Sequence, residues 1–203
     1  MKGGAGHAQR DYAGAKLGMW LFLLTEAMFF FGPVLLYAVF RMRFPSEFSA
    51  ASRELDLATG ALNTVVLITS SLLVASAVSA MKRGSRNLAA ALLIATVALG
   101  AFFIFNKYVE WDAKILHGIY PDSATLLAEP YGKVVFYGLY FFLTGLHGLH
   151  VLAGMGALSV TTVMVYRGAI TPDDHVRLEN TGLYWHLVDI IWIFLFPFFY
   201  LVT

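Results

Sequence analysis

The sequence contains no cysteine and few charged residues. Of its 203 residues, 13% are Asp, Glu, Lys or Arg, and the formal net charge is +1. The lack of cysteine excludes disulfide bonds, iron–sulfur clusters, thiolate metal sites and cysteine nucleophiles. The small net charge and the scattered basic residues argue against nucleic acid as a partner. Any metal site in this chain would have to be built from histidine and carboxylate side chains.

Hydrophobic residues make up 59% of the sequence, more than a soluble domain of this size could bury. A helix needs about 20 apolar residues to cross the hydrocarbon core of a bilayer. Five segments meet that length, at residues 17–40, 57–81, 88–108, 134–166 and 182–202. No segment alternates with the period of a membrane β-barrel strand. The sequence therefore predicts an all-α, polytopic membrane bundle of five transmembrane helices.

The polar segments between these runs define the expected organisation of the chain. Residues 1–16 are polar and glycine-rich, and we expect a polar N-terminal arm there. The apolar run that follows is too long for the core of a signal peptide and lacks a small-residue cleavage pattern. Residues 17–203 are expected to form one transmembrane bundle, because no connection is long enough to make a second domain.

A short basic loop predicts the orientation of the chain in the membrane. Lys82, Arg83 and Arg86 share one loop with no acidic residue. Because basic loops stay on the cytoplasmic side, we expect the N-terminus in the cytoplasm and the C-terminus outside. The same three side chains are expected to hold phospholipid head groups.

Besides Lys107 at the end of the third span, five ionisable side chains fall inside the predicted spans, where charge is costly. They are Glu26 in the first span, His147 and His150 in the fourth, and His186 and Asp189 in the fifth. We expect them to form a buried polar network that is related to proton handling. Simpler alternatives also fit the residues: Glu26 as a neutral acid hydrogen-bonded between helices, and Asp189 accepting a hydrogen bond from His186 on its own helix.

Cofactor sites are the competing interpretation of these residues. A di-metal site in a helical bundle uses Glu-x-x-His pairs, and this sequence has none, so we predict no metal site. Haem held by two histidines, such as His147 and His186, is allowed but not required. We assign no catalytic residue and no cofactor to this chain.

Aromatic and charged residues near the helix ends are expected to contact lipid or the interface. Glu110 and Trp111 lie just past the third run, beside Lys107. We expect an interfacial ion pair of Lys107 with Glu110, which contributes little energy if it is solvated, and an indole that anchors the helix end. The aromatic runs at residues 29–31 and 194–200 are expected to face lipid.

Four blocks of the sequence carry a resemblance to a known family. They are Met19 to Gly32 (MWLFLLTEAMFFFG), Leu62 to Ser71 (LNTVVLITSS), Phe141 to Gly154 (FFLTGLHGLHVLAG), and Glu179 to Tyr200, which contains YWHLVDIIWIFLF. In this order they resemble subunit III of the haem–copper cytochrome c oxidases, and the likeness covers nearly the whole chain. Family members usually have seven helices, so this chain resembles a five-helix form that lacks the first two.

The resemblance implies a non-catalytic subunit of a proton-translocating oxidase in a bacterial plasma membrane. Its partners would be oxidase subunits I and II, which carry haem and copper, together with bound phospholipid. Glu26 corresponds to the family's intramembrane glutamate, which is linked to proton uptake by the neighbouring subunit. Lys107 stands where many relatives carry Gln. A stand-alone haem-binding membrane protein, a transporter, and the related subunit of a nitric oxide reductase system are the alternatives.

Overall fold

The computed structural model describes residues 4–202, with side chains from Tyr12 onward, and all of its regular elements are helices. They are α1 (Gly4–Arg43), α2 (Pro45–Arg53), α3 (Leu57–Lys82), α4 (Arg86–Leu116), α5 (Ala124–Leu127), α6 (Tyr131–Tyr166) and α7 (Val176–Tyr200). Helices α1, α3, α4, α6 and α7 are long and apolar enough to cross a bilayer. The predicted fold class, an all-α bundle with five membrane spans, is confirmed.

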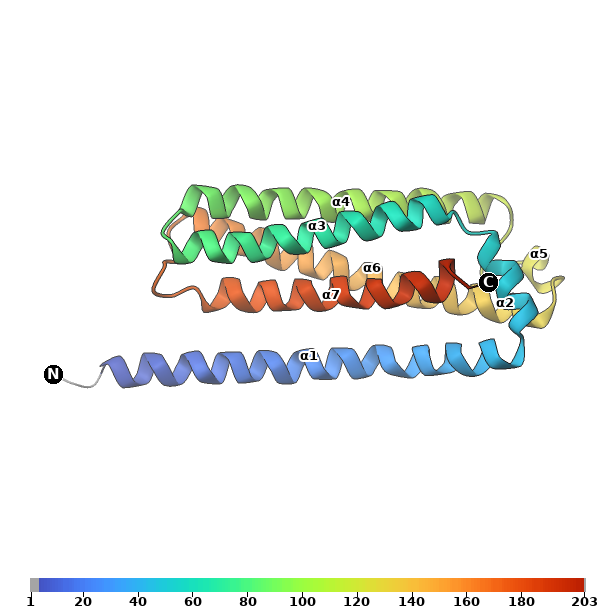
Figure 1. The fold of residues 1–203 in the computed structure, drawn as a ribbon, viewed down its shortest axis with the longest axis horizontal. Coiled ribbons are helices and arrows are strands. Elements are labelled where there is room, and N and C mark those ends of the chain that lie inside the picture. The colour runs from blue at the N-terminus through green and yellow to red at the C-terminus, as the bar shows by residue number, and fades with distance from the viewer. Residues whose placement is uncertain (1–3, 203) are drawn as a thin grey trace.

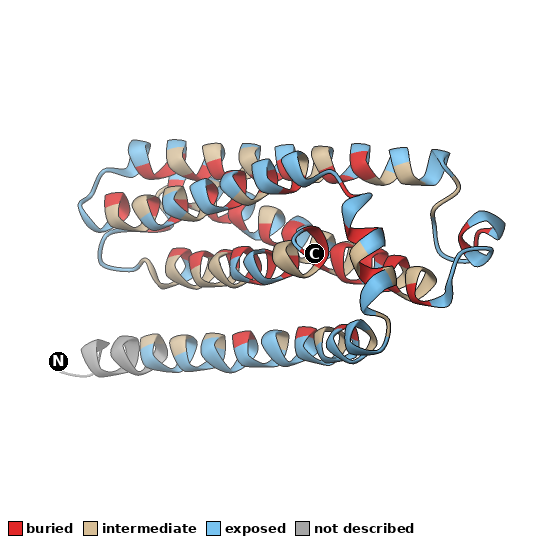
Figure 2. Ribbon diagram, turned by 45° about the vertical axis from the view of Figure 1, so that its right-hand side comes forward, coloured by how far each residue is buried: buried red, intermediate tan, exposed pale blue. Residues whose placement is uncertain are grey.

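Four of the long helices form the core of the bundle. Helix α3 packs against α4 and α7, and α6 packs against the same two helices, so the four close into a ring. Figure 1 shows them running side by side, with the short helices α2 and α5 at the end that carries the C-terminus. Figure 2 shows the buried residues of these helices facing one another inside the ring.

Helix α1 lies outside this ring, against α6 and α7. It begins at Gly4, so residues 4–16 continue the helix ahead of the span expected from residue 17. Of its described side chains, Leu23, Phe30 and Tyr37 are buried, at intervals of seven residues. A single narrow stripe therefore joins α1 to the bundle, and most of the other side chains of this helix from Tyr12 onward are exposed (Figure 2).

Local sequence signals explain where several helices begin and end. The carboxylate of Asp56 caps α3 by accepting hydrogen bonds from the backbone N–H groups of Ala58 and Thr59, at 3.0 and 3.3 Å. Pro45 opens α2, where a missing N–H group costs nothing. Gly84, which follows α3, has a φ of 78°, a conformation that glycine adopts without strain.

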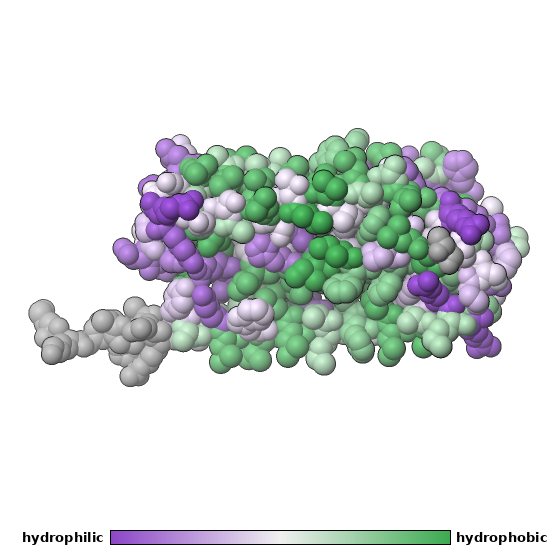
Figure 3. Space-filling view, in the orientation of Figure 1, coloured by the Kyte–Doolittle hydropathy of each residue, from purple (hydrophilic) through white to green (hydrophobic). Residues whose placement is uncertain are grey.

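Large aromatic side chains fill the middle of the ring, which corrects one expectation. Trp192, Phe199 and Tyr200 are buried, although the 194–200 run was expected to face lipid. Phe29 and Phe31 are exposed as expected, but Phe30 between them is buried. The expectation failed because successive side chains of a helix point in different directions around its axis. Only part of a continuous aromatic run can therefore face outward. Figure 3 shows the outer surface as a hydrophobic band with hydrophilic residues gathered at both ends.

Candidate functional site

Glu26 of α1 and His150 of α6 meet near the middle of both helices. Nε2 of His150 lies 2.8 Å from Oε2 of Glu26, and both side chains are largely buried. The other ring nitrogen, Nδ1, is 2.8 Å from the carbonyl oxygen of Leu146 and must therefore carry a proton. The contact between Nε2 and Oε2 then holds one further proton. It lies either on Glu26, beside a neutral imidazole, or on the ring, beside a carboxylate.

The surroundings fix this pair in place. The ring of Phe30 packs edge-on against the His150 imidazole, with centroids 5.0 Å apart. Tyr184 of α7 donates a hydrogen bond to the backbone oxygen of His150 at 3.3 Å. The imidazole thus contacts two side chains of α1, and α7 holds the backbone of the same residue. The pair can shift a proton between carboxyl and ring without changing its total charge.

The other predicted polar residues lie apart from this pair. His147 is fully buried against the rings of Phe103 and Trp192, and neither of its nitrogens has a hydrogen-bond partner within residues 4–202. Nδ1 of His186 lies 2.6 Å from Oγ of Ser71 on α3. Asp189 is buried, and neither carboxylate oxygen has a partner in the described part of the chain. Of the five predicted residues, the structure joins only Glu26 and His150 by a hydrogen bond.

Lys107 and Glu110 form an ion pair, but it is buried rather than solvated. Lys107 Nζ lies 3.0 Å from Glu110 Oε2, and the two residues are 7% and 8% exposed. Nζ also donates to the hydroxyl groups of Tyr140 and Tyr200, at 2.9 and 3.0 Å. Both hydroxyls donate in turn to Glu110 Oε1 at 2.5 Å. The expectation of a weak, water-exposed pair is therefore wrong, because α6 and α7 enclose the end of this α4 turn.

Tyr140 and Tyr200 were missed in the sequence, although a signal for them exists. A buried tyrosine hydroxyl usually finds a hydrogen-bond partner, so tyrosines inside the fourth and fifth spans indicate nearby polar groups. Trp111, expected as an interfacial anchor, instead packs its indole against the ring of Phe141 at 5.1 Å and beside Gly145 on α6.

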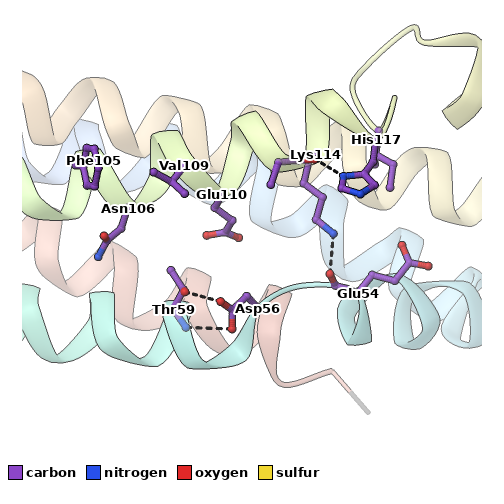
Figure 4. Close-up of a pocket in the computed structure, with 11 residues that line it drawn as sticks. Glu54, Asp56, Thr59, Phe105, Asn106, Val109, Glu110, Lys114 and His117 are labelled. Atoms are coloured by element: carbon purple, nitrogen blue, oxygen red, sulfur yellow. Dashed lines mark hydrogen bonds between the residues drawn. The ribbon is translucent and has the colours of Figure 1, made fainter.

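A pocket of about 600 Å³ opens beside this cluster, between α3 and α4. Figure 4 shows Glu110 and Asn106 at one side of it, with Glu54, Asp56 and Lys114 around the rim. Burial raises the pKa of Glu54, but hydrogen bonds from Lys133 and Tyr137 outweigh that effect, so its pKa lies below the ordinary value. Hydrogen bonds from Thr59 lower the pKa of Asp56. Both rim acids therefore stay ionised at neutral pH.

The opposite end of the bundle carries a second charge cluster, centred on Glu179 of α7. Its carboxylate lies 2.9 Å from Lys16, 2.7 Å from Lys82 and 3.2 Å from His175, and accepts a hydrogen bond from Tyr12 at 2.8 Å. Lys82, predicted to hold lipid, is thus paired within the protein. Arg83 is exposed, and Arg86 donates to the backbone oxygen of Tyr166 at 3.0 Å.

No group of three or more His, Asp or Glu side chains is arranged to hold a metal ion among the side chains that the structure describes, which begin at Tyr12. The polar groups of the site are instead paired with one another or buried singly. Hydrogen bonds between helices, such as those of Glu26 with His150 and of Lys107 with Tyr140, hold neighbouring helices in register.

Comparison with known proteins gives the same family over nearly the whole chain. A family model described as cytochrome c oxidase subunit III matches residues 3–203. The chain is 28% identical to the cytochrome bo(3) ubiquinol oxidase subunit 3 of Pseudomonas aeruginosa, over 97% of this chain and 88% of the relative. It is 30% identical to cytochrome c oxidase subunit 3 of Gallus gallus, over 94% of this chain and 70% of the relative. Cytochrome c oxidase subunit 3 of Triticum aestivum is also 30% identical, with 94% and 69% covered. The chain belongs to the cytochrome c oxidase subunit III family.

Proposed function

We propose that this protein is the non-catalytic third subunit of a respiratory haem–copper oxidase in a bacterial plasma membrane. In that complex, subunits I and II would carry the haem and copper and reduce oxygen. This chain would stabilise the catalytic subunit, bind phospholipid and support proton uptake during electron transport. Family membership and the five membrane spans support the assignment.

The Glu26–His150 pair is the observation that carries the proposed role in proton uptake. A carboxyl group at membrane depth costs free energy unless it is paired, so its retention calls for a purpose. The 2.8 Å contact between Oε2 and Nε2 keeps one proton available at mid-depth. The two side chains are largely buried but keep 15% and 21% of their surface exposed, and through that surface the pair would exchange its proton with a neighbouring subunit.

The basic loop between α3 and α4 supports the proposed phospholipid binding. Arg83 and Arg86 are exposed, and Lys82 is exposed beside its ion pair with Glu179. Cationic side chains at a membrane surface attract anionic head groups at about 1 kcal/mol each. This loop lies at the same end as the described start of α1, which agrees with the proposed cytoplasmic N-terminus.

Helix α1 offers a place for a neighbouring chain. Most of its length is exposed, including the large apolar side chains Leu24, Met28, Phe31 and Leu35. Usual family members have two further helices, and a partner subunit or a small extra chain would take their place against α1. A structure of the complex with bare lipid along α1 would contradict this part of the proposal.

Substitution of Glu26 tests the proposed function. In the native complex, Glu26→Gln removes the exchangeable carboxyl proton but keeps the side-chain volume. We expect normal assembly, slower proton uptake and faster loss of activity during turnover. Glu129→Gln is the matched control, because that acid is exposed at its own ion pair with Lys133, 3.3 Å away. Unchanged proton uptake and turnover in Glu26→Gln would remove the proton-uptake role.

A further inference from the structure

A groove runs along the flank of the bundle between α3 and α7. Its main hollow, of about 440 Å³, has apolar walls formed by Ile68, Leu72, Ile190 and Ile193. A second hollow of about 280 Å³ continues it toward Glu179, and the two share Ala75 and His186. Figure 3 shows hydrophilic atoms at mid-length within this otherwise hydrophobic flank. The groove therefore places polar groups at the depth of the hydrocarbon core.

Three polar side chains line the main hollow: Ser71, His186 and Asp189. The hydroxyl of Ser71 and Nδ1 of His186 lie 2.6 Å apart, which leaves Nε2 of this half-buried ring to find another partner. Asp189 lies beneath them, 2% exposed, with Ser71 as the polar side chain nearest to it. Nε2 of His186 is therefore the hydrogen-bonding group in this groove that the described side chains leave free for a partner.

Other polar side chains on the flanks do not share this property. Thr69 donates to the backbone oxygen of Val65 at 2.8 Å, and Ser159 donates to that of Met155 at 2.7 Å. Hydroxyl groups can return to their own helix in this way, so they need no partner in lipid. An imidazole whose second nitrogen faces outward still needs a hydrogen-bond partner from outside the helix. Acyl chains offer neither donors nor acceptors. The groove is the flank least suited to lipid.

We propose that the α3/α7 groove is the docking surface for a transmembrane helix of the oxidase's catalytic subunit. The partner helix would present a hydroxyl or amide side chain to Nε2 of His186, since these groups can donate and accept. This inference rests on the proposed function and adds to it the face by which the chain binds its partner.

The shape of the groove fits a helix lying along it. Ala75 is exposed at the point shared by the two hollows, and a small residue there lets another backbone approach closely. On α7, the positions that line the groove are 179, 182, 183, 186, 189, 190 and 193, which recur at intervals of three and four residues. That spacing produces a straight stripe on a helix, which is the contact surface of a helix pair.

Single cysteines offer a direct test, because the natural chain has none. Spin labels would be attached in the groove at Leu72→Cys or Ile190→Cys, and on other flanks at Ile94→Cys or Val160→Cys. All four positions are exposed in the isolated chain. Collision of each label with dissolved oxygen is measured in lipid, for the isolated chain and for the native complex. The complex with the cysteine-free chain supplies the background from partner cysteines.

We expect oxygen collision at Leu72 and Ile190 to fall severalfold in the complex, while Ile94 and Val160 keep the values of the isolated chain. Groove labels that stay as accessible as the controls, in a complex that holds the catalytic subunit, would overturn the docking surface alone. A chain that purifies without any catalytic subunit would overturn the proposed function as well. The two failures are therefore distinguishable.

A second variant tests the chemistry of the contact. His186→Phe keeps an aromatic ring but removes both nitrogens, and we expect severalfold less of this chain to be retained in the purified complex. The thermal stability of the isolated chain serves as the check on folding. Ser159→Ala, at a hydroxyl that bonds its own helix, is the control and should be retained normally. Normal retention of His186→Phe would contradict the role of the imidazole in docking.

Discussion

Lys107 and Glu110, one turn apart on α4, form an ion pair inside the protein, with Nζ 3.0 Å from Oε2. Each of the three N–H groups of the ammonium has an acceptor, since Tyr140 and Tyr200 take the other two. The Trp192 ring lies 5.4 Å from Nζ and adds a cation–π contact. The pair therefore links α4, α6 and α7 through one closed set of hydrogen bonds.

Removing one charge of this pair should lower the free energy of unfolding far more than removing both charges together. Lys107→Met leaves the Glu110 carboxylate buried without its cation, and we expect a loss of about 3–5 kcal/mol in the free energy of unfolding. The double variant Lys107→Met with Glu110→Gln removes both charges and should recover much of that loss. Thermal or denaturant unfolding of the solubilised chain measures both effects.

The pair of Lys133 and Glu129 provides the comparison, because the Glu129 side chain is 41% exposed and Lys133 keeps a second partner in Glu54. The charged atoms of Lys133 and Glu129 are 3.3 Å apart, and Glu129→Gln should cost at most about 1 kcal/mol. Equal losses at the two sites, or a double variant at Lys107 and Glu110 as unstable as the single one, would show that the buried pair is not coupled.

Helix packing around Trp185 predicts that alanine substitutions at two nearby glycines of α6 will differ in their effect on stability. A Cβ atom added at Gly154 would lie 2.8 Å from the Trp185 ring, whereas one added at Gly156 would meet nothing within 4 Å. We expect Gly154→Ala to destabilise the chain by about 1–3 kcal/mol through overpacking. Gly156→Ala on the same helix should be neutral or slightly stabilising, because alanine favours helix. Melting temperatures of the two variants check this, and equal values would contradict the packing.

The acid Glu54 predicts how stability depends on pH. Its pKa is lowered on folding, despite burial, by hydrogen bonds from Lys133 and Tyr137. Its contribution is therefore complete above the ordinary pKa of 4.5 and is lost as the pH falls through the lower folded value. The melting-temperature advantage of the natural chain over Glu54→Gln should hold steady at about pH 5.5–7 and shrink below 4.5. An advantage that grows on acidification would mean that the pKa is raised instead.

The sequence was sufficient to predict the fold because hydrophobic length is a direct consequence of bilayer thickness. Five apolar runs became five long helices, and they extend past the predicted spans where polar turns continue the helix, as at Val176 and Gly4. The short helices α2 and α5 were not predicted, because each is held by packing at the bundle end. Phe48 of α2 and Leu126 of α5 are buried there.

The site was harder to predict, because depth in the membrane does not determine rotation about a helix axis. His147 and His150 were expected to share one buried polar network, yet His147 lies among aromatic rings inside the bundle and His150 contacts Glu26 on α1. Those directions depend on which helices are neighbours. The burial of Lys107 depends in the same way on Tyr140 and Tyr200, which are distant in the sequence.

Isolation of the native complex tests the central claim most directly. Membranes would be solubilised gently, and the chain would be followed by mass spectrometry together with the haem absorbance of each fraction. We predict that the chain elutes with a haem–copper catalytic subunit in a fixed ratio and that the haem belongs to that subunit. A chain that elutes alone, or that carries a haem spectrum of its own, would contradict the assignment.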